Sequence, residues 1–340
     1  MMRIAIAQPV RPRYSRAMAI APHDLIASPD HYLHSFDGDE AVFVPMDAAA
    51  YRRSIFLDAR ISPASEGALG VPVGQLAAER LPKGPPMGWI FHVAHCGSTL
   101  LARAIEALAG NLVLKEPAAL RQLGFAPDDE RLDIVLALLA RRYEASAMTI
   151  VKANVPVNFL LSDIAARRPD DAAIVLYWGL EDYLTAILRS DNHRQWLRGI
   201  TTHFAGHLGL GSDASDAERA AALWKGQVER FGALKAAMPR TVSLDAGRLF
   251  ADPRGVLCAA AQHFGIETTG ANLDAVMVGG LFKTYSKRPD IAFDNTDRLA
   301  RAEAVSSAIG DEIAAAHAWF CAQGDSSAEL EARLTKIALA

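Results

Sequence analysis

A short turn between an apolar strand and a helix carries the residues best suited to chemistry. In the stretch FHVAHCGSTLLARAI, Gly97 is followed directly by two hydroxyl residues, Ser98 and Thr99. A turn of this kind, at the end of a first parallel strand, points backbone N–H groups and the positive end of a helix dipole at one spot. Glycine lets the backbone approach a ligand, and the hydroxyls can donate hydrogen bonds. The stretch therefore predicts a loop that binds an oxyanion.

The loop lacks the lysine that completes the common nucleotide-binding loops. The pattern GxxxxGK[ST] is not met, because Ser98 follows Gly97 with no lysine between them. No aspartate suited to holding magnesium is evident on a neighbouring strand, so magnesium-assisted γ-phosphate transfer lacks two of its usual parts. Ligands that need no metal are favoured. The alternative is an ordinary strand-to-helix turn, with glycine for packing and hydroxyls for capping.

Charged residues end the next two strand-like runs. The run LKEP ends the second predicted strand with Lys115 and Glu116, and the proline after them breaks that strand. Lys152 follows the run MTIV in the same way. Because the carboxyl ends of parallel strands surround the crevice where α/β proteins bind ligands, we expect these residues near Gly97. Glu116 is a candidate base and either lysine a candidate cation; a salt-bridged strand end is the alternative.

Around Gly97 the sequence resembles the sulfotransferase superfamily, whose phosphosulfate-binding loop commonly reads Lys-Ser-Gly-Thr-Thr. Here His95 and Cys96 precede Gly97, Ser98 and Thr99. The glycine and both hydroxyl positions match, whereas His95 replaces the lysine and Cys96 the first serine. The resemblance implies that this loop holds the 5′ end of 3′-phosphoadenosine 5′-phosphosulfate (PAPS). A protonated imidazole at position 95 could serve as the cation or acid.

The same resemblance implies roles for the charged strand ends. Some sulfotransferases that act on sugars carry a Lys-Glu pair at the second strand, with the glutamate as base. It implies Glu116 as the catalytic base, with Lys115 and His95 stabilising the leaving phosphate and the transferred group. Lys152 is a further candidate for binding the donor. Sulfuryl transfer needs such a base, such cations and in-line positioning of the reacting groups.

The sequence departs from the superfamily at its next fingerprint. That fingerprint reads roughly Arg-x-Pro-x-Asp with a serine four residues on, and its arginine and serine hold the donor's 3′-phosphate. Asp182 takes the aspartate position, but Trp178 replaces the arginine and Ala186 the serine. Arg189 and Ser190, a few residues on, are the candidate substitutes for binding the cofactor. An arginine that only complements a helix dipole is the alternative.

The resemblance continues, in patches, to about residue 288. The run VSLDAGRLFADPRGVLCAAAQHFGI fits the superfamily's sequence of a strand, an Asp-Pro step and a helix that ends in Phe-Gly. Family members often use a later basic loop to cover the 3′-phosphate and adenine. Lys287 and Arg288, in the run YSKR, are the candidates for that loop. A solvated basic turn is the alternative.

Alternating apolar and helical patterns must position these residues. From Trp89 on, strand-like runs such as WIFHV and AAIVLYW alternate with amphipathic stretches. This pattern predicts an α/β domain over residues 84–340, with a doubly wound, mainly parallel sheet of the P-loop type. It predicts a helix over residues 213–238, TVSLD as the last strand, and a helix opened by Asp252 and closed by Gly265. A loop and two alanine-rich helices follow.

Residues 1–83 show short runs such as AVFVPM between turn-forming residues, and they predict a small mixed or strand-rich N-terminal region. The connector LPKGPPMG would end that region. The formal charge of −4 and the pI near 6.2 give no broad basic field, so we expect no nucleic-acid partner. No run approaches the roughly 20 apolar residues of a membrane span, and no signal peptide is evident.

Three separated cysteines, without a CxxC pair, indicate neither a disulfide framework nor a zinc site, and we expect no metal. These features fit a cytoplasmic protein. The favoured function is transfer of a sulfuryl group from PAPS to a hydroxyl or amine of a small molecule or sugar. One alternative is a P-loop small-molecule kinase that uses Lys115 or Lys152 in place of the loop lysine and depends on magnesium. The other is a non-catalytic nucleotide-binding protein. The oligomeric state cannot be predicted.

Overall fold

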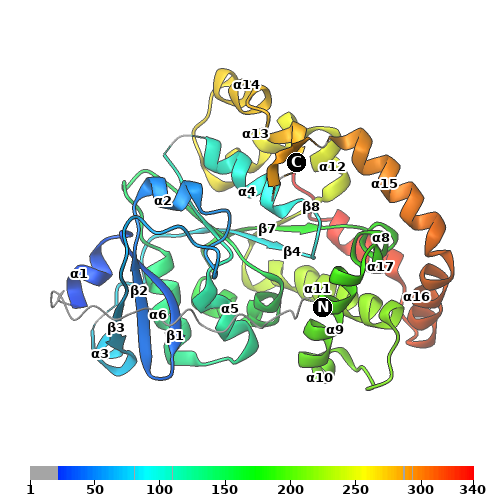
Figure 1. The fold of residues 1–340 in the computed structure, drawn as a ribbon, viewed down its shortest axis with the longest axis horizontal. Helices are drawn as coiled ribbons and strands as arrows, with labels where there is room; N and C mark the ends of the chain where they lie inside the picture. Colours follow the sequence, from blue (N-terminus) through cyan, green and yellow to red (C-terminus); the bar gives the residue numbers. More distant parts are fainter. Residues whose placement is uncertain (1–21, 80, 109, 286–287, 293) are drawn as a thin grey trace. The chain divides into compact units, whose positions relative to one another are not determined.

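The computed structural model describes residues 22–79, 81–108, 110–285, 288–292 and 294–340. Its five-stranded sheet has the order β5-β6-β4-β7-β8, so the chain begins at the central strand and adds strands on both sides. Figure 1 labels β4, β7 and β8 of this sheet. The β5–β6 and β7–β8 pairs are parallel. This topology confirms the predicted doubly wound, mainly parallel α/β fold. The strands of this sheet are β4 Gly88–His92, β5 Leu112–Lys115, β6 Thr149–Lys152, β7 Ala172–Tyr177 and β8 Arg240–Asp245.

The chain divides into two compact units. Unit 1 comprises Met1–Trp89 and Ala109–Leu160, and unit 2 comprises Ile90–Leu108 and Leu161–Ala340. The predicted domain boundary between residues 83 and 84 stays a prediction.

Unit 1 combines an antiparallel sheet with helices. In the described residues this sheet has the order β1-β2-β3. Its strands are β1 His31–Asp37, β2 Glu40–Pro45 and β3 Leu69–Pro72. The helices are α1 Pro22–Ala27, α2 Ala48–Arg53, α3 Val73–Ala78, α5 Ala118–Phe125, α6 Asp129–Leu139 and the 3₁₀ helix η1 Val155–Leu160.

Two sets of hydrogen bonds join the N-terminal segment to the rest of unit 1. The Phe36 N–H donates to Gln122 Oε1, and Gln122 Nε2 donates back to the Phe36 carbonyl, which ties β1 to α5. The Leu57 N–H donates to the Lys115 carbonyl over 2.7 Å, and the Ala118 N–H donates to the Leu57 carbonyl. Residues 54–58 therefore run along the end of β5, beside the predicted catalytic pair.

Unit 2 is organised around α11, whose apolar face is buried. Ser215 and Glu218 form a capping box at its start, and Trp224 and Phe231 are fully buried. The helix predicted over residues 213–238 is confirmed. The other helices are α4 Ser98–Ala107, α7 Leu161–Arg167, α8 Leu180–Leu188, α9 Asp191–His203, α10 Ala205–Leu208, α11 Asp216–Ala237, α12 Ala246–Ala251, α13 Pro253–Phe264, α14 Gly270–Val278 and the 3₁₀ helix η2 Leu281–Lys283.

Helix α13 has the ends that its sequence predicts. The Asp252 side chain accepts from the Gly255 N–H, proline stands in the first turn, and Gly265 closes the helix in the left-handed region. These three features match the residue preferences of helix starts and stops.

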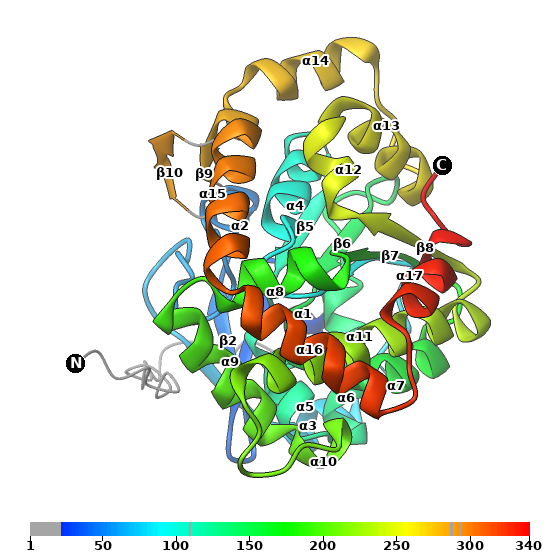
Figure 2. The same ribbon diagram turned by 90° about the vertical axis from the view of Figure 1, so that its right-hand side faces the viewer.

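The C-terminal part differs from its prediction in two ways. The segment expected to be a loop contains a short antiparallel ribbon of β9 Thr284–Tyr285 and β10 Arg288–Ala292, so β8 is not the last strand. Three helices follow instead of two: α15 Asn295–Ala308, α16 Gly310–Ala322 and α17 Ser327–Thr335. Both α16 and α17 pack on α11 (Figure 2), whereas α15 has no buried residue.

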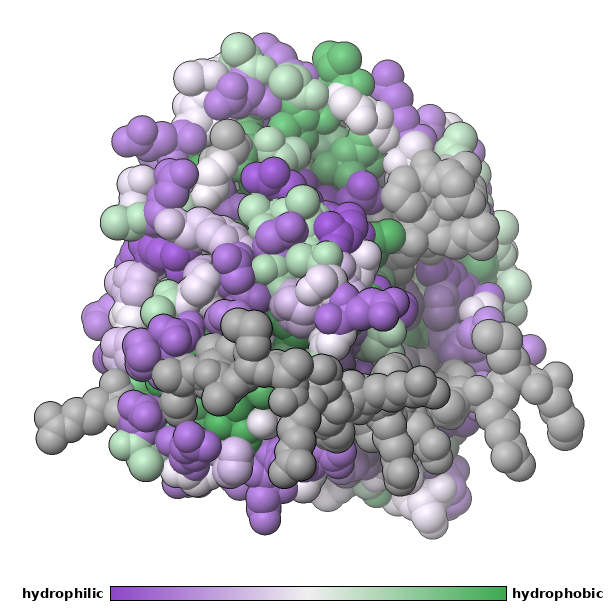
Figure 3. All heavy atoms as spheres, turned by 60° about the vertical axis from the view of Figure 1, so that its left-hand side comes forward, coloured by the Kyte–Doolittle hydropathy of each residue, from purple (hydrophilic) through white to green (hydrophobic). Residues whose placement is uncertain are grey.

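Hydrophilic residues predominate on the face drawn in Figure 3, with small hydrophobic patches among them. Among the described residues, the exposed large hydrophobic side chains are those of Tyr143, Val278 and Leu299. Within that part of the chain, no helix has the length and apolar character needed to cross a membrane.

Candidate functional site

The predicted oxyanion loop is a tight turn in unit 2, between the end of β4 and the start of α4. The Val93 N–H donates to the Leu176 carbonyl over 3.1 Å, which holds the turn against β7. The buried Cys96 thiol donates to the Val93 carbonyl over 3.0 Å. The Cys96 side chain therefore stabilises the turn through a buried hydrogen bond, and it is not accessible to a ligand from solvent.

Two residues of the turn adopt the left-handed backbone region. His95 has a φ of 61°, and Gly97 has a φ of 85°. A side-chain carbon at position 97 would also lie 2.9 Å from Phe250 Cζ and 3.3 Å from Leu249 Cδ2. Glycine is thus required at position 97 for two separate reasons, the backbone conformation and the close approach of α12.

The start of α4 is left uncapped by side chains. Gly97 occupies the N-cap position, and no side chain accepts a hydrogen bond there. The first intrahelical bond runs from the Leu101 N–H to the Gly97 carbonyl, so the N–H groups of Ser98, Thr99 and Leu100 have no acceptor within the helix. The structure thus disfavours the interpretation in which the hydroxyls serve only to cap. An anion with several oxygen acceptors suits three such N–H groups at a helix start.

His95 belongs to a cluster of rings beside the loop. Its ring centroid lies 4.1 Å from that of His193 and 6.1 Å from that of Trp196, both on α9. Arg189 Nε donates to His193 Nδ1 over 3.0 Å. Arg189 Nη2 also lies 3.4 Å from His193 Nε2, so the guanidinium faces both ring nitrogens. The structure therefore connects the predicted residues Arg189 and His95 through His193.

Ser190 is the N-cap residue of α9, next to Arg189, and its side chain accepts no capping hydrogen bond. His193 lies in the first turn of α9.

An aromatic pair lies on the other side of the turn. Trp178 Nε1 donates to the His95 carbonyl over 3.2 Å. The rings of Trp178 and Phe250 stack with centroids 5.8 Å apart and planes 7° apart. Sequence reasoning singled out Trp178 only as a departure from a fingerprint and did not find Phe250 or Trp196. Their common signal, an aromatic residue just after a strand or within a helix, is too frequent to identify a site.

The predicted base lies in unit 1, at the end of β5. Glu116 has a φ of 58°, and its N–H donates to the Lys152 carbonyl over 2.8 Å. Lys152 Nζ donates to Glu116 Oε1 in an ion pair. The Lys152 side chain is 1% exposed and that of Glu116 is 18% exposed, so the carboxylate forms the solvent-facing end of a buried pair.

Lys115 takes a different partner from Lys152. The two lysines are register neighbours in the parallel β5–β6 pair. Lys115 is 1% exposed, and its Nζ donates to the Tyr51 carbonyl over 3.0 Å. Its ammonium group therefore donates to the backbone of α2, whereas that of Lys152 donates to Glu116.

The N-terminal segment supplies residues around this pair that the sequence did not indicate. Lys152 Nζ lies 5.6 Å from the centre of the Phe56 ring, and the Arg60 guanidinium carbon lies 3.8 Å from the centre of the same ring. Arg60 forms a salt bridge with Asp58 over 2.5 Å. Burial alone would raise the pKa of Asp58, but the hydrogen bonds from Arg60 hold it below its usual range.

His95 and Glu116 share an unusual backbone property. Among the described residues, they are the two other than glycine that adopt a positive φ. Such conformations are uncommon for side-chain-bearing residues, and they cluster at functional sites. Both residues were predicted as catalytic from sequence. Whether they act together stays a prediction, because Glu116 belongs to unit 1 and His95 to unit 2; the same holds for the expected closeness of Lys115 and Lys152 to Gly97.

The last two predicted cofactor residues cannot be assigned side-chain contacts. Lys287 lies outside the described residues, and Arg288 begins β10 opposite Tyr285. Their role in covering the nucleotide stays a prediction. Among the described residues, no group of three or more His, Cys, Asp or Glu side chains is arranged to hold a metal ion.

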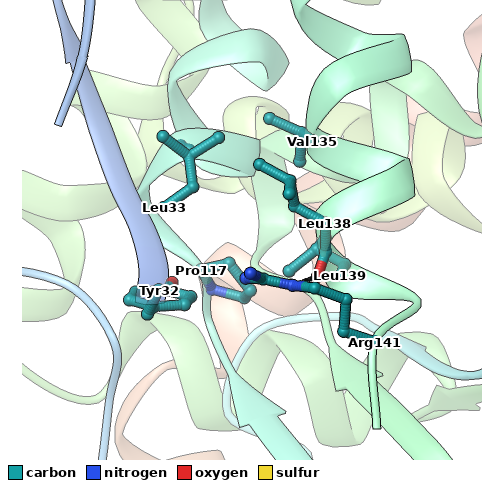
Figure 4. A pocket seen from close by; sticks show the side chains of 8 residues that line it. Tyr32, Leu33, Pro117, Val135, Leu138, Leu139 and Arg141 are labelled. Atoms are coloured by element: carbon teal, nitrogen blue, oxygen red, sulfur yellow. Dashed lines mark hydrogen bonds between the residues drawn. The ribbon is translucent and has the colours of Figure 1, made fainter. Parts of the chain in front are cut away.

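A small cavity in unit 1 is lined in part by Pro117, the proline that follows Glu116 (Figure 4). Its polar lining groups already have partners. Arg141 donates to the carbonyls of Leu25, Ser28 and His31, and burial lowers the pKa of its guanidinium to about 10. We assign no ligand to it. The lining residues are Tyr32, Leu33, Pro117, Ala119, Val135, Leu138, Leu139 and Arg141.

The fold and the loop together describe a doubly wound α/β protein whose central strand is followed by a turn with N–H groups that have no acceptor within the helix. No protein-family model matches the sequence, and no curated protein matches it. Several solved structures are similar to the chain, and sulfotransferases are among them.

A sulfotransferase domain from the curacin biosynthetic pathway is 11% identical, with a TM-score of 0.40 over 66% of this chain and 98% of that one. A sulfotransferase from Alicyclobacillus acidocaldarius is 12% identical, with a TM-score of 0.37 over 69% of this chain and 99% of that one. A mouse sulfotransferase complexed with PAP is 10% identical, with a TM-score of 0.35 over 86% of this chain and 98% of that one. These values describe a distant likeness only.

Proposed function

We propose that this protein transfers a sulfuryl group from PAPS to a hydroxyl or amine of a small molecule or sugar. The observation that carries the proposal is the uncapped start of α4 behind a strained turn. Three N–H groups there have no acceptor within the helix. Gly97, in the left-handed region, has no side chain to cover the backbone at that point. A phosphate with no metal ion attached is the kind of ligand that this arrangement suits.

In this proposal the loop binds the 5′-phosphate of the donor. The N–H groups of Ser98 and Thr99 stabilise the negative charge that grows on the phosphate oxygen as the bond to sulfur breaks. His95 takes the position of the usual loop lysine and donates a hydrogen bond to the leaving group. The leaving group is adenosine 3′,5′-bisphosphate, abbreviated PAP.

Glu116 is proposed as the base. A carboxylate oxygen takes the proton of the acceptor hydroxyl or amine, the acceptor atom forms a bond to sulfur, and the bond from sulfur to the phosphate oxygen breaks. The ion pair with Lys152 fixes the carboxylate in one orientation, and the partial exposure of Glu116 leaves it accessible to an acceptor. Lys115 is proposed to hold the strand end through Tyr51 instead of contacting the transferred group.

Contacts in unit 1 give no support to the kinase alternative. It requires Lys115 or Lys152 to replace the absent loop lysine, yet Lys115 donates to a backbone carbonyl and Lys152 to Glu116. We therefore do not propose it. The non-catalytic alternative makes the same prediction for the loop as the sulfotransferase and differs only at Glu116.

Thermal unfolding in the presence of four ligands tests the proposal: PAP, ATP with magnesium, ADP and inorganic sulfate. A ligand that binds only the folded protein raises its apparent stability, by about 2.7 kcal/mol at a hundred times its dissociation constant. We expect PAP to raise the melting temperature most, and equally with and without magnesium. A larger, magnesium-dependent shift with ATP would point to the kinase. No shift with any of the four ligands would remove the nucleotide site altogether.

A further inference from the structure

A guanidinium group on α15 lies over the aromatic pair beside the loop. The Arg298 guanidinium carbon lies 5.2 Å from the centre of the Trp178 ring and 4.8 Å from that of the Phe250 ring. The two rings themselves are stacked almost in parallel. Guanidinium groups commonly stack on aromatic faces in this way and keep their N–H edges available for other partners.

The same aromatic pair also touches the oxyanion loop. Trp178 donates to the His95 carbonyl, and a side-chain carbon at position 97 would lie only 2.9 Å from Phe250 Cζ. Arg298 and the loop therefore contact the same two aromatic residues. All of these residues belong to unit 2, so the arrangement depends on contacts within a single unit.

The charge of Arg298 is only partly balanced by the protein. Its Nε donates to Asn295 Oδ1 over 2.8 Å, and among the described residues no hydrogen bond or ion pair engages its Nη1 and Nη2 atoms. Burial lowers the pKa of the guanidinium, and the more distant Asp182 and Asp245 oppose that shift. A half-buried cation without a carboxylate at salt-bridge distance favours an anionic partner, and a guanidinium suits a phosphate with two oxygens side by side.

We propose that Arg298 binds the 3′-phosphate of the nucleotide whose 5′-phosphate lies at the loop. The inference rests on the proposed function, because it needs a ligand with two separate phosphate groups. Arg298 then supplies the positive charge for the 3′-phosphate. In the superfamily fingerprint an arginine supplies it at the position that Trp178 occupies in this chain. The cation comes from a helix far along the chain, and the tryptophan becomes the surface on which that cation lies.

A purely structural role for Arg298 makes a different prediction. In that case the guanidinium only covers the two rings, and its loss would weaken the binding of every nucleotide to the same degree. The comparison of a nucleotide that has a 3′-phosphate with one that lacks it separates the two roles. PAP and AMP form such a pair, since both carry a 5′-phosphate on adenosine.

The experiment measures dissociation constants of PAP and AMP, by calorimetry, for the wild type and three variants. We expect Arg298→Gln to weaken PAP about 10- to 100-fold, the range for losing a hydrogen bond to a charged group, and to leave AMP nearly unchanged. Arg298→Lys should recover part of the affinity for PAP. Arg301→Gln, which removes the same charge from an exposed position on the same helix, should bind both nucleotides as the wild type does.

Each other outcome counts against one specific claim. If the wild type binds PAP and Arg298→Gln leaves the ratio of the two constants unchanged, Arg298 is structural and this inference fails while the proposed function stands. An equal loss of PAP and AMP leads to the same conclusion. If the wild type binds neither nucleotide, the proposed function fails, and this inference fails with it.

Discussion

The turn after β4 and the turn after β5 look alike in their backbones and differ in their charges. Each contains a residue with a side chain in the left-handed region, His95 in one and Glu116 in the other. After β4 the chain enters a helix whose first N–H groups have no side-chain cap. After β5 the carboxylate already has a partner, the buried ammonium group of Lys152.

This difference separates two tasks. After β4, the first N–H groups of α4 have no acceptor within the helix, so an anionic ligand from outside would complete them. After β5, the Glu116 carboxylate is paired with Lys152 at the end of β6, so the turn needs no ligand to be stable, and the carboxylate can take part in proton transfer. The backbone strain is similar in the two turns, whereas the chemistry follows from how the polar groups are paired.

The largest expected effect is on catalysis at the second turn. Glu116→Gln keeps the shape of the side chain but removes the carboxylate that would accept a proton. We expect turnover to fall about 10²- to 10⁴-fold, the usual contribution of a general base, while the dissociation constant of PAP stays the same. Steady-state kinetics with a sulfated-product assay and calorimetry with PAP measure the two quantities.

Glu130→Gln is the matched control for this change, because it alters the same residue type at an exposed position on α6 of the same unit. Unchanged turnover in Glu116→Gln would remove that residue from the mechanism. A large loss of PAP affinity would instead mean that the two turns do not have separate tasks.

The ion pair at the second turn gives the next effect, on stability. Lys152→Met fills the same buried space but leaves the Glu116 carboxylate without its partner. We expect a loss of about 1–3 kcal/mol in the free energy of unfolding, less than for a fully buried pair because Glu116 is partly exposed. Urea unfolding of both single variants and of the double variant Lys152→Met/Glu116→Gln measures the coupling between the two residues.

The double variant should be more stable than Lys152→Met alone, because it no longer contains a partly buried carboxylate that has lost the Lys152 ammonium group. The exposed pair of Arg254 and Asp274 serves as the comparison, and Arg254→Met should leave the free energy of unfolding almost unchanged. If Lys152→Met were equally harmless, the second turn would not be held together by its own charges.

The third effect, also on stability, concerns the glycine at the first turn. Gly97→Ala should lower the free energy of unfolding by about 2 kcal/mol, because a left-handed alanine and a contact at 2.9 Å from Phe250 both cost free energy. Gly265→Ala is the matched control, since Gly265 is also left-handed, with a φ of 71°, but has open space around it. It should lose only the backbone part, about 1 kcal/mol.

Urea unfolding measures both glycine variants. Equal losses in the two variants would show that α12 does not press on the loop in solution. A second change, Phe250→Ala in the Gly97→Ala background, should recover the contact part of the loss and so identify its source.

Much of the sheet could be predicted because its strands are continuous apolar runs whose ends are marked by charged residues, glycine or proline. The prediction that Lys115 and Lys152 stand at the ends of two parallel strands is confirmed, and the structure shows that these strands are neighbours. The loop at Gly97 could be found because a strand, a glycine and hydroxyl residues stand together within a few positions. Local patterns of this kind follow from short-range sterics and hydrogen bonding.

The remaining site residues depend on contacts between distant parts of the sequence. Phe56 reaches Lys152, and Arg298 reaches Trp178, without any local pattern that marks either contact. The ribbon of β9 and β10 is very short and contains a proline, so its pattern is that of a loop. Helix α15 buries no residue in the structure, and its alanine-rich sequence predicts a helix but not its partners.

The pairing of residues 54–58 with the end of β5 also bears on how the protein is made. The partner of Leu57, the carbonyl of Lys115, is synthesised about sixty residues later, which is roughly 3–12 s at ribosomal speeds of 5–20 residues per second. During that interval Phe56 and Leu57, both buried in the finished protein, lack their partners at the ends of β5 and β6. A nascent chain that ends before Lys115 therefore exposes apolar side chains at residues 56 and 57, which can aggregate. A chaperone that binds this segment until Lys115 is synthesised would raise the yield of folded protein.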